Sequence, residues 1–318
     1  MNSQKKTRAM IEASLMAALT CIFAIVGTYI PFLAFVLLFI PIPFIVLGKR
    51  HGMQFVVLSI IASAIIIGSL TEPIYSIFVV ALPGITAIVM GYLMNKEYSP
   101  GKVLAGGAVA ALISSLISIS LTALISGVGT ITQISEILKE VTDMQIAIYG
   151  RMGMEAQQLE QMKASMANSM QVASMIIPAA IMLSAVFLAY INYMLTVQVL
   201  RRIGYKVEQL SPLREFYLPK SILMGTFIII GLTMLMRYVN IIDYTTLVAN
   251  VFVIFQFIYL IQGLAVVSYF MTAFHMGKAL KIILLLFILL NQMGLFMVAM
   301  IGFVDVFVNF RKLKNKID

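Results

Sequence analysis

Tryptophan is absent from this chain, cysteine occurs once, and only 11% of the 318 residues are charged. Without tryptophan, an interfacial aromatic belt of a membrane protein must come from tyrosine and phenylalanine. The single cysteine, Cys21, excludes an intrachain disulfide, and its place in an apolar run is typical of a buried small side chain. The scarcity of charge excludes an ordinary soluble domain, in which about a quarter of the residues are charged.

The short motifs that mark common catalytic and metal sites are also missing. The sequence contains no Walker A loop, no HExxH pair, no GxSxG elbow and no cysteine cluster. His51 and His275 each lie near lysine or arginine at an expected helix end, without the spacing of a two-histidine metal site. We therefore expect no enzyme activity, no catalytic residue, no metal and no other cofactor.

Apolar residues make up 61% of the chain, and the mean hydropathy is +1.02. A transmembrane helix needs about 20 consecutive apolar residues. The sequence therefore predicts an all-α polytopic bundle of eight or nine spans. In the second expected span, Pro31, Pro41 and Pro43 predict a kinked or partly broken helix. The candidate spans cover residues 9–30, 31–48, 53–70, 74–94, 103–126, 172–200, 221–238, 245–270 and 282–304.

The net charge of +9 does not indicate nucleic-acid binding, because the cations lie in short loops between apolar runs. Their distribution follows the positive-inside rule. It predicts a multi-pass membrane protein with a cytoplasmic N-terminus. Expected outer loops carry only Lys139, Arg151, Lys163 and Arg237. Expected inner loops carry Lys5, Lys6, Arg8, Lys49, Arg50, Lys96, Lys102, Arg201, Arg202, Lys206, Arg214, Lys220, Lys278 and Lys281.

The basic tail at residues 311–316 conflicts with a count of nine spans. Nine crossings would place it outside, against the charge rule, whereas eight would place it in the cytoplasm. The number of apolar segments slightly favours nine spans. If the tail is cytoplasmic, one late apolar segment must be re-entrant or interfacial.

Residues 127–170 differ from the apolar runs on either side. Charged side chains are frequent there, and apolar residues recur on one side of an expected helix. This pattern predicts an amphipathic helical hairpin on the outer membrane surface, hinged near Gly150 and Gly153. A solvated loop is the alternative. The apolar positions are Ile134, Ile137, Leu138, Val141, Met144, Ile148 and Met152.

Ala9, Ala13 and Ala17 recur every fourth residue and line one face of the first span. Small residues let another helix approach closely, so this face packs inside the chain or docks a partner subunit. Glu12, on the same turn, has the simple explanation that a first-turn acid is favoured by the helix dipole.

A second candidate site lies near the outer ends of the early spans. Glu72 stands close to the phenols Tyr29 and Tyr75, and together they offer a grip for a small polar ligand. An ordinary surface turn is the alternative, because Glu72 directly precedes a proline.

Polar side chains also lie within the last spans. Amides such as Gln262 are expected to hydrogen-bond between helices. Asp305, near the end of the last span, has Asn309 and Lys312 within helical reach, which predicts a local surface network.

Two C-terminal stretches carry a resemblance to a known family. Residues 262–267, followed by 302–305 and 309–312, resemble the YybS family of bacterial membrane proteins. The resemblance extends over the whole chain. The family-pattern residues are Gln262, Gly263, Gly302, Asp305 and Arg311.

The first 200 residues are similar, more weakly, to the S components of energy-coupling factor (ECF) transporters. That resemblance implies a six-helix domain over residues 1–200, with residues 127–170 as an insert and 201–318 as a C-terminal extension. It also implies that the Ala9, Ala13 and Ala17 face docks a transmembrane coupling subunit. A further likeness, to MreD-like membrane scaffolds, implies protein binding without a solute.

The expected partners are the lipid bilayer, a coupling subunit and a small-molecule solute, with no nucleic acid. Small-solute binding or transport is the leading prediction, and a membrane scaffold is the alternative. A transporter requires a polar cavity within the first six helices, open to the outer side. A scaffold requires a packed bundle whose polar groups satisfy one another.

Overall fold

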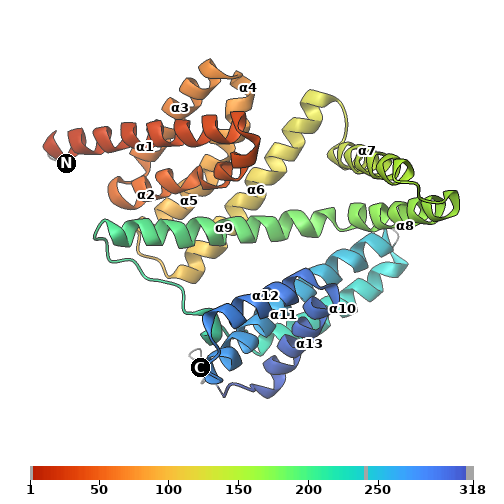
Figure 1. The fold of residues 1–318 in the computed structure, drawn as a ribbon. Coiled ribbons are helices and arrows are strands. Elements are labelled where there is room, and N and C mark those ends of the chain that lie inside the picture. The colour runs from red at the N-terminus through yellow and green to blue at the C-terminus, as the bar shows by residue number, and fades with distance from the viewer. Residues whose placement is uncertain (1–2, 240–242, 313–318) are drawn as a thin grey trace. The chain divides into compact units, whose positions relative to one another are not determined.

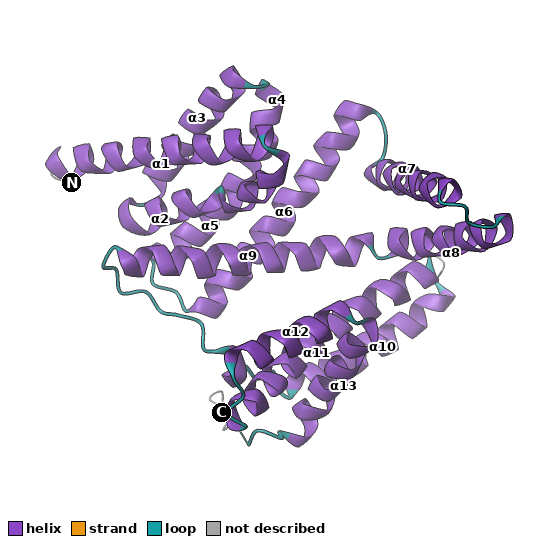
Figure 2. Cartoon of the chain, in the orientation of Figure 1, coloured by secondary structure: helices purple, strands orange, loops and turns teal. Residues whose placement is uncertain are grey.

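The computed structural model describes residues 3–239 and 243–312. Within those ranges every regular element is a helix and no strand occurs (Figure 1) (Figure 2), so the predicted all-α fold is confirmed. The elements are α1 Ser3–Tyr29, η1 Pro31–Phe39, α2 Pro41–His51, α3 Met53–Leu70, α4 Pro73–Ser76, η2 Ile77–Ala81, α5 Leu82–Asn95, α6 Pro100–Ser126, α7 Thr130–Arg151, α8 Ala156–Met175, α9 Ile177–Arg202, η3 Leu213–Glu215, α10 Ser221–Leu235, η4 Met236–Tyr238, α11 Tyr244–Ala273, α12 Lys278–Leu290 and α13 Gln292–Val308.

Eight segments of the described chain are long and apolar enough to cross a bilayer. Six of them come before residue 203, as expected for the N-terminal part of the chain. A ninth candidate is a pair of helices, α12 and α13, that bend by 103° at their junction. The eight segments are Gln4–Tyr29, Pro31–His51, Met53–Leu70, Pro73–Asn95, Pro100–Ser126, Ile177–Arg202, Ser221–Tyr238 and Tyr244–Ala273.

The chain divides into two compact units. Unit 1 comprises residues 1–134 and 180–210, and unit 2 comprises residues 135–179 and 211–318. The sequence prediction grouped the segment 127–170 with residues 1–200. In the structure most of this segment clusters with unit 2. One reason is Asn250 of α11, whose amide bonds both the carbonyl oxygen of Met175 and the backbone N–H of Ala179, at 2.7 Å each.

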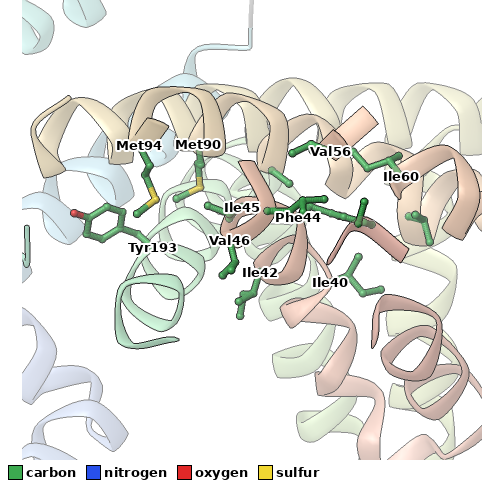
Figure 3. Close-up of a cluster of buried hydrophobic side chains, with 14 of the residues drawn as sticks. Ile40, Ile42, Phe44, Ile45, Val46, Val56, Ile60, Met90, Met94 and Tyr193 are labelled. Atoms are coloured by element: carbon green, nitrogen blue, oxygen red, sulfur yellow. The ribbon is translucent and has the colours of Figure 1, made fainter. Parts of the chain in front are cut away.

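Helix α2 is the centre of unit 1. Its residues from Pro41 to Gly48 are all buried, and their side chains belong to one hydrophobic cluster with Val56 of α3, Met90 of α5 and Tyr193 of α9 (Figure 3). Gly48 approaches Gly91 so closely that a Cβ atom on Gly48 would lie 3.0 Å from the Gly91 Cα. The predicted break in this span is confirmed, since a 3₁₀-helix precedes α2.

The fourth candidate span has an irregular turn that the apolar pattern did not predict. Between α4 and α5 lies a π-helix, Ile77–Ala81, in which the N–H of Leu82 bonds the carbonyl of Ile77. Pro83 follows and has no N–H to donate, so a regular α-helical ladder cannot pass through it. Single π turns of this kind occur frequently at functional sites.

Helices α7 and α8 form the two-helix segment predicted from the pattern over 127–170. Gly153, with a φ of +86°, lies in the turn between them, and the Thr142 hydroxyl contacts the Met170 sulfur at 3.5 Å. The apolar face of α7 is exposed: Ile137 is 59% accessible and Met144 is 60% accessible. Its place on the outer membrane surface stays a prediction.

Helices α10 and α11 of unit 2 are joined by a short connection, and a hydrogen bond of 2.7 Å links the hydroxyls of Thr226 and Tyr259. Asp243 caps α11 by accepting the N–H of Thr246 at 2.7 Å. Hydrogen bonds from Thr246 lower the pKa of the Asp243 carboxyl. The cap is therefore present at neutral pH and weakens when acid protonates Asp243.

The last candidate span is broken at Asn291. The Asn291 side chain accepts the N–H groups of Met293 and Gly294 and so starts a new helix, α13. At the other end of α13, the Arg311 guanidinium donates to the carbonyl of Arg214, just before α10, at 3.0 Å. Because α11 returns beside α10, α12 begins and α13 ends at the same end of unit 2.

The bent pair is either a broken ninth span or a re-entrant loop, and we predict eight crossings with α12 and α13 as a re-entrant pair. We expect the tail after Lys312, of which residues 313–318 lie outside the described part, to share the side of the basic loop 201–220. In the predicted orientation that side is the cytoplasm. A fluorescent protein fused after Asp318 should therefore fluoresce, and alkaline phosphatase fused there should be inactive. Active phosphatase would instead show nine crossings.

Candidate functional site

A cavity of about 360 Å³, open on one side, lies in unit 1 among α5, α6 and α9, with Pro41 of α2 also lining it. Its size falls within the range of about 300–1,000 Å³ that is usual for small-molecule sites. The apolar part of the lining includes Phe78, Leu82 and Ile119. The polar part consists of hydroxyls, from Thr86, Ser114, Ser115, Ser118 and Ser184.

The hydroxyls project from helices whose local structure holds them in place. Ser114 donates to the carbonyl of Leu82 at 2.7 Å, at the junction between the π-helix and α5. Ser184 donates to the carbonyl of Ile181 at 2.8 Å. Both oxygens keep lone pairs that can accept a hydrogen bond. An apolar cavity with a few such groups is typical of a binding site for a small organic molecule.

The helices beside this cavity are irregular. Pro41 opens α2, Pro83 opens α5, and the π-helix before α5 contributes Phe78 to the lining. At membrane depth, interrupted helices are tolerated where they are covered by protein or line a cavity. In the predicted orientation, Ile181 and Ser184 lie in the first turns of α9, so the cavity occupies the outer half of the membrane.

The predicted ligand residues do not line this cavity. The phenol of Tyr75 bonds the Thr28 hydroxyl at 2.6 Å. Tyr29, 62% exposed, has its hydroxyl 3.5 Å from the Leu70 carbonyl, and Glu72 is exposed just before α4. All three residues lie where the end of α1 meets the turn between α3 and α4. The hydrogen bonds of the two tyrosines connect α1 to α3 and α4.

The predicted docking face of α1 is covered by α3. Ala9, Ala13 and Ala17 are only 0–3% exposed. The hydroxyl of Ser59 donates to the Ala13 carbonyl at 2.9 Å, and that of Ser63 to the Ala17 carbonyl at 3.4 Å. Of the two alternatives for this face, the structure shows packing inside the chain, because the small residues let α3 approach this closely.

Glu12 is the centre of an ionic cluster at the opposite end of unit 1 from the α3–α4 turn. Two guanidinium nitrogens of Arg50 contact its two carboxylate oxygens at 2.8 and 2.9 Å. His51 Nε2 lies 2.6 Å from one of these oxygens, and Arg8 Nε lies 3.2 Å from the other. The expectation that the helix dipole alone explains Glu12 is therefore wrong.

The cluster extends to the segment after α9. Arg50 Nε donates to the Tyr205 hydroxyl at 3.2 Å, and the guanidinium lies 5.5 Å from the centre of the Tyr205 ring. Tyr193 holds the same segment by donating to the Glu208 carbonyl at 2.8 Å. The cluster thus links α1, the end of α2 and the chain beyond α9. Sequence spacing could not reveal these contacts, because Tyr205 is 155 positions from Arg50.

Unit 2 contains a buried ion pair built from three of the family-pattern residues. Arg311 Nη2 lies 2.9 Å from an Asp305 carboxylate oxygen, and both side chains are 0% exposed. The Gln262 amide donates to the same oxygen at 2.7 Å, and the N–H of Phe310 donates to the other at 2.9 Å. A surface network with Lys312 was expected, and the burial of Asp305 shows that expectation to be wrong.

Tyr217 lies beside this pair and donates its hydroxyl to the Val306 carbonyl at 3.3 Å. Burial, together with the negative charge of Asp305, raises the pKa of the Tyr217 phenol. The phenol therefore stays neutral and remains a donor at physiological pH.

The other two family-pattern residues make the helix contact beside the pair. A Cβ atom on Gly263 would collide with the Val298 carbonyl, and one on Gly302 would collide with the Tyr259 carbonyl. Both glycines are therefore required where α11 and α13 touch. This contact brings Gln262 to Asp305.

Breaking the buried pair should destabilise the protein strongly. Asp305→Ala or Arg311→Ala leaves an unpaired buried charge, and we expect a loss of about 3–5 kcal/mol of unfolding free energy. The double variant Asp305→Leu/Arg311→Met should regain most of it. Thermal denaturation in detergent measures both effects. Arg214→Ala, which removes a half-exposed ion pair with Glu215, is the control and should change little.

The glycine contact gives a separate prediction. Gly302→Ala should lower the free energy of unfolding by about 1–3 kcal/mol, because α11 must move away from α13. Gly231→Ala, in α10, is the matched control, since a Cβ atom there meets no atom within 4 Å. Equal melting temperatures for the two variants would contradict the contact.

Comparison with known proteins agrees with the fold. Residues 18–306 match the family described as "Predicted membrane protein (DUF2232)". The chain is also 22% identical over 309 residues to a Bacillus subtilis (strain 168) protein named "Uncharacterized protein YybS", covering 95% of this chain and 96% of that protein. No solved structure matches significantly. The resemblance to the YybS family is therefore confirmed, and the chain belongs to the DUF2232 family of membrane proteins.

Proposed function

We propose that this protein is a non-enzymatic membrane protein that binds a small solute in the cavity of unit 1. The observation that supports this most directly is the set of hydroxyls from α5, α6 and α9 around one apolar space. A packed scaffold core has no need of such a space. The cavity also lies within the first six candidate spans, where a solute transporter would require it.

The lining indicates the chemistry of the solute. Among the described residues that line the cavity none is charged, and the polar groups are serine and threonine hydroxyls. A neutral molecule, mostly apolar and with a few hydroxyl, carbonyl or amide groups, matches this lining. A strongly charged solute does not, because the described lining offers it no counter-charge.

The predicted resemblance of the first 200 residues to ECF S components implies uptake of such a solute. In that case a coupling subunit must use a surface other than the Ala9, Ala13 and Ala17 face, which α3 covers. The exposed face of α1 offers one alternative, since Ile11 is 57% and Leu15 is 61% accessible.

A membrane scaffold is the second candidate, and the amphipathic helix α7 is the observation that favours it. Four apolar residues on one α7 face are each at least 46% exposed, which suits a partner helix or the bilayer surface. They are Ile137, Val141, Met144 and Ile148, and Met152, directly after the helix, is 75% exposed. A scaffold would need no ligand in unit 1.

Thermal-shift measurements on the purified protein against vitamins, nucleosides and other neutral metabolites should separate the two candidates. We expect at least one compound to raise the melting temperature. A broad panel without any stabilisation would contradict the solute site and favour the scaffold.

Matched variants on one helix locate the site. Ser118→Leu should fill part of the cavity and weaken binding of the stabilising compound at least tenfold. Ser120→Leu, two residues away, places the same side chain on an exposed position of α6 and should leave the affinity unchanged. Equal affinities for the two variants would place the ligand elsewhere.

A further inference from the structure

Two buried polar atoms on α9 have no hydrogen-bond partner. The amide oxygen of Asn192 and the hydroxyl of Thr196 are unpaired, and both residues are 0% exposed. The residues are one helical turn apart and therefore share a face of α9. Unpaired buried polar groups destabilise a fold, so each one in a native structure requires an explanation such as a bound water or another ligand.

Asn192 and Thr196 follow the cavity-lining residue Leu188 along α9. Leu188 lines the cavity, and the Asn192 side chain donates to the Leu188 carbonyl at 2.9 Å. Ala189 of the same face lies beside Gly107, since a Cβ atom on that glycine would come 3.4 Å from the Ala189 Cβ. The face therefore points toward α6, which also lines the cavity. Asn192 and Thr196 follow along it, toward the end of α9 that precedes Tyr205.

The ionic cluster lies at the far end of the same helices. Helix α2 contributes Pro41 to the cavity and Arg50 to the cluster, and α9 leads to Tyr205. The end of α5 lies there too, because the Asn95 side chain donates to the Lys49 carbonyl, at the end of α2, at 3.0 Å. The charge rule places this end in the cytoplasm.

We infer that unit 1 contains a solute pathway that starts at the cavity, passes Asn192 and Thr196, and is closed toward the cytoplasm by the Glu12–Arg50–Tyr205 cluster. This inference rests on the proposed solute site and extends it from binding to passage. The two unpaired atoms supply hydrogen-bonding groups for water or solute beyond the cavity. The cluster holds α1, the end of α2 and the segment after α9 together, so the pathway opens only when these contacts separate.

The test uses thiol accessibility and needs no ligand. Cys21 is the sole cysteine, so Cys21→Ala gives a thiol-free background. Thr196→Cys then places one thiol on the proposed pathway. A membrane-impermeant maleimide is applied to inside-out vesicles, which expose the cytoplasmic side. With the cluster intact, we expect slow labelling.

Disrupting the cluster should open the pathway. Arg50→Gln and Glu12→Gln should each raise the labelling rate of the Thr196→Cys thiol at least tenfold. Lys49→Gln is the matched control, because the partner of Lys49, Glu97, is largely exposed and lies outside the cluster. It should change the rate less than twofold. No increase with either cluster variant would overturn the inference.

General loosening of the protein is distinguished by a second reporter. Val56, on α3, is 0% exposed and packs in the hydrophobic cluster of unit 1. A Val56→Cys thiol should stay unlabelled in the Arg50→Gln and Glu12→Gln variants. Equal gains at both reporters would mean unfolding and would overturn the inference. Because labelling needs no ligand, a failed thermal-shift panel rejects the solute site without deciding the thiol result.

Discussion

A polar group inside a bilayer has no water to bond, so every such group must find a partner within the protein or carry a free-energy cost. This constraint explains most of the polar chemistry of the chain. Serine and threonine hydroxyls bond backbone carbonyls, as Ser59 bonds Ala13 across the α1–α3 contact. The same constraint makes the few exceptions informative, and two of them lie together on α9.

Charged groups obey the constraint in two different ways. The Asp305 and Arg311 pair is fully buried, and its oxygens are bonded by Gln262 and by the N–H of Phe310. Such a pair contributes little net stability but fixes one arrangement, since moving either partner leaves a buried charge. The Glu12 and Arg50 pair keeps side-chain exposures of 13% and 15%, so separating it costs less. This difference in burial suits the Asp305 and Arg311 pair to a fixed contact, and the Glu12 and Arg50 pair to one that can separate.

Local patterns in the sequence predicted the local parts of the structure. Apolar runs predicted eight of the helical spans, and prolines predicted the break before α2. The pattern over residues 127–170 predicted two helices. The break at Asn291 was missed because a capping side chain changes hydropathy little while it starts a new helix. The π-helix before Pro83 was missed for a similar reason.

Contacts between distant positions could not be predicted from one sequence. Glu12 had a sufficient local explanation, and its partners Arg50 and Tyr205 are set by the packing of unit 1. Gln262 and Asp305 were both marked by the family resemblance, yet their hydrogen bond depends on the Gly263 and Gly302 contact between α11 and α13. The cavity hydroxyls were missed because serines in α6 also suit simple helix packing.

The irregular backbone of unit 1 gathers where the polar groups do. Proline and π turns leave carbonyls without their usual donors, which is tolerated at membrane depth only beside other donors or a hydrated space. The Leu82 carbonyl, in the first residue of α5 directly after the π-helix, accepts a hydrogen bond from Ser114, a residue that also lines the cavity. One hydroxyl thus ties α6 to the irregular start of α5 and lines the cavity at the same time. Because its proton is already donated to the backbone, Ser114 would meet a solute as a hydrogen-bond acceptor.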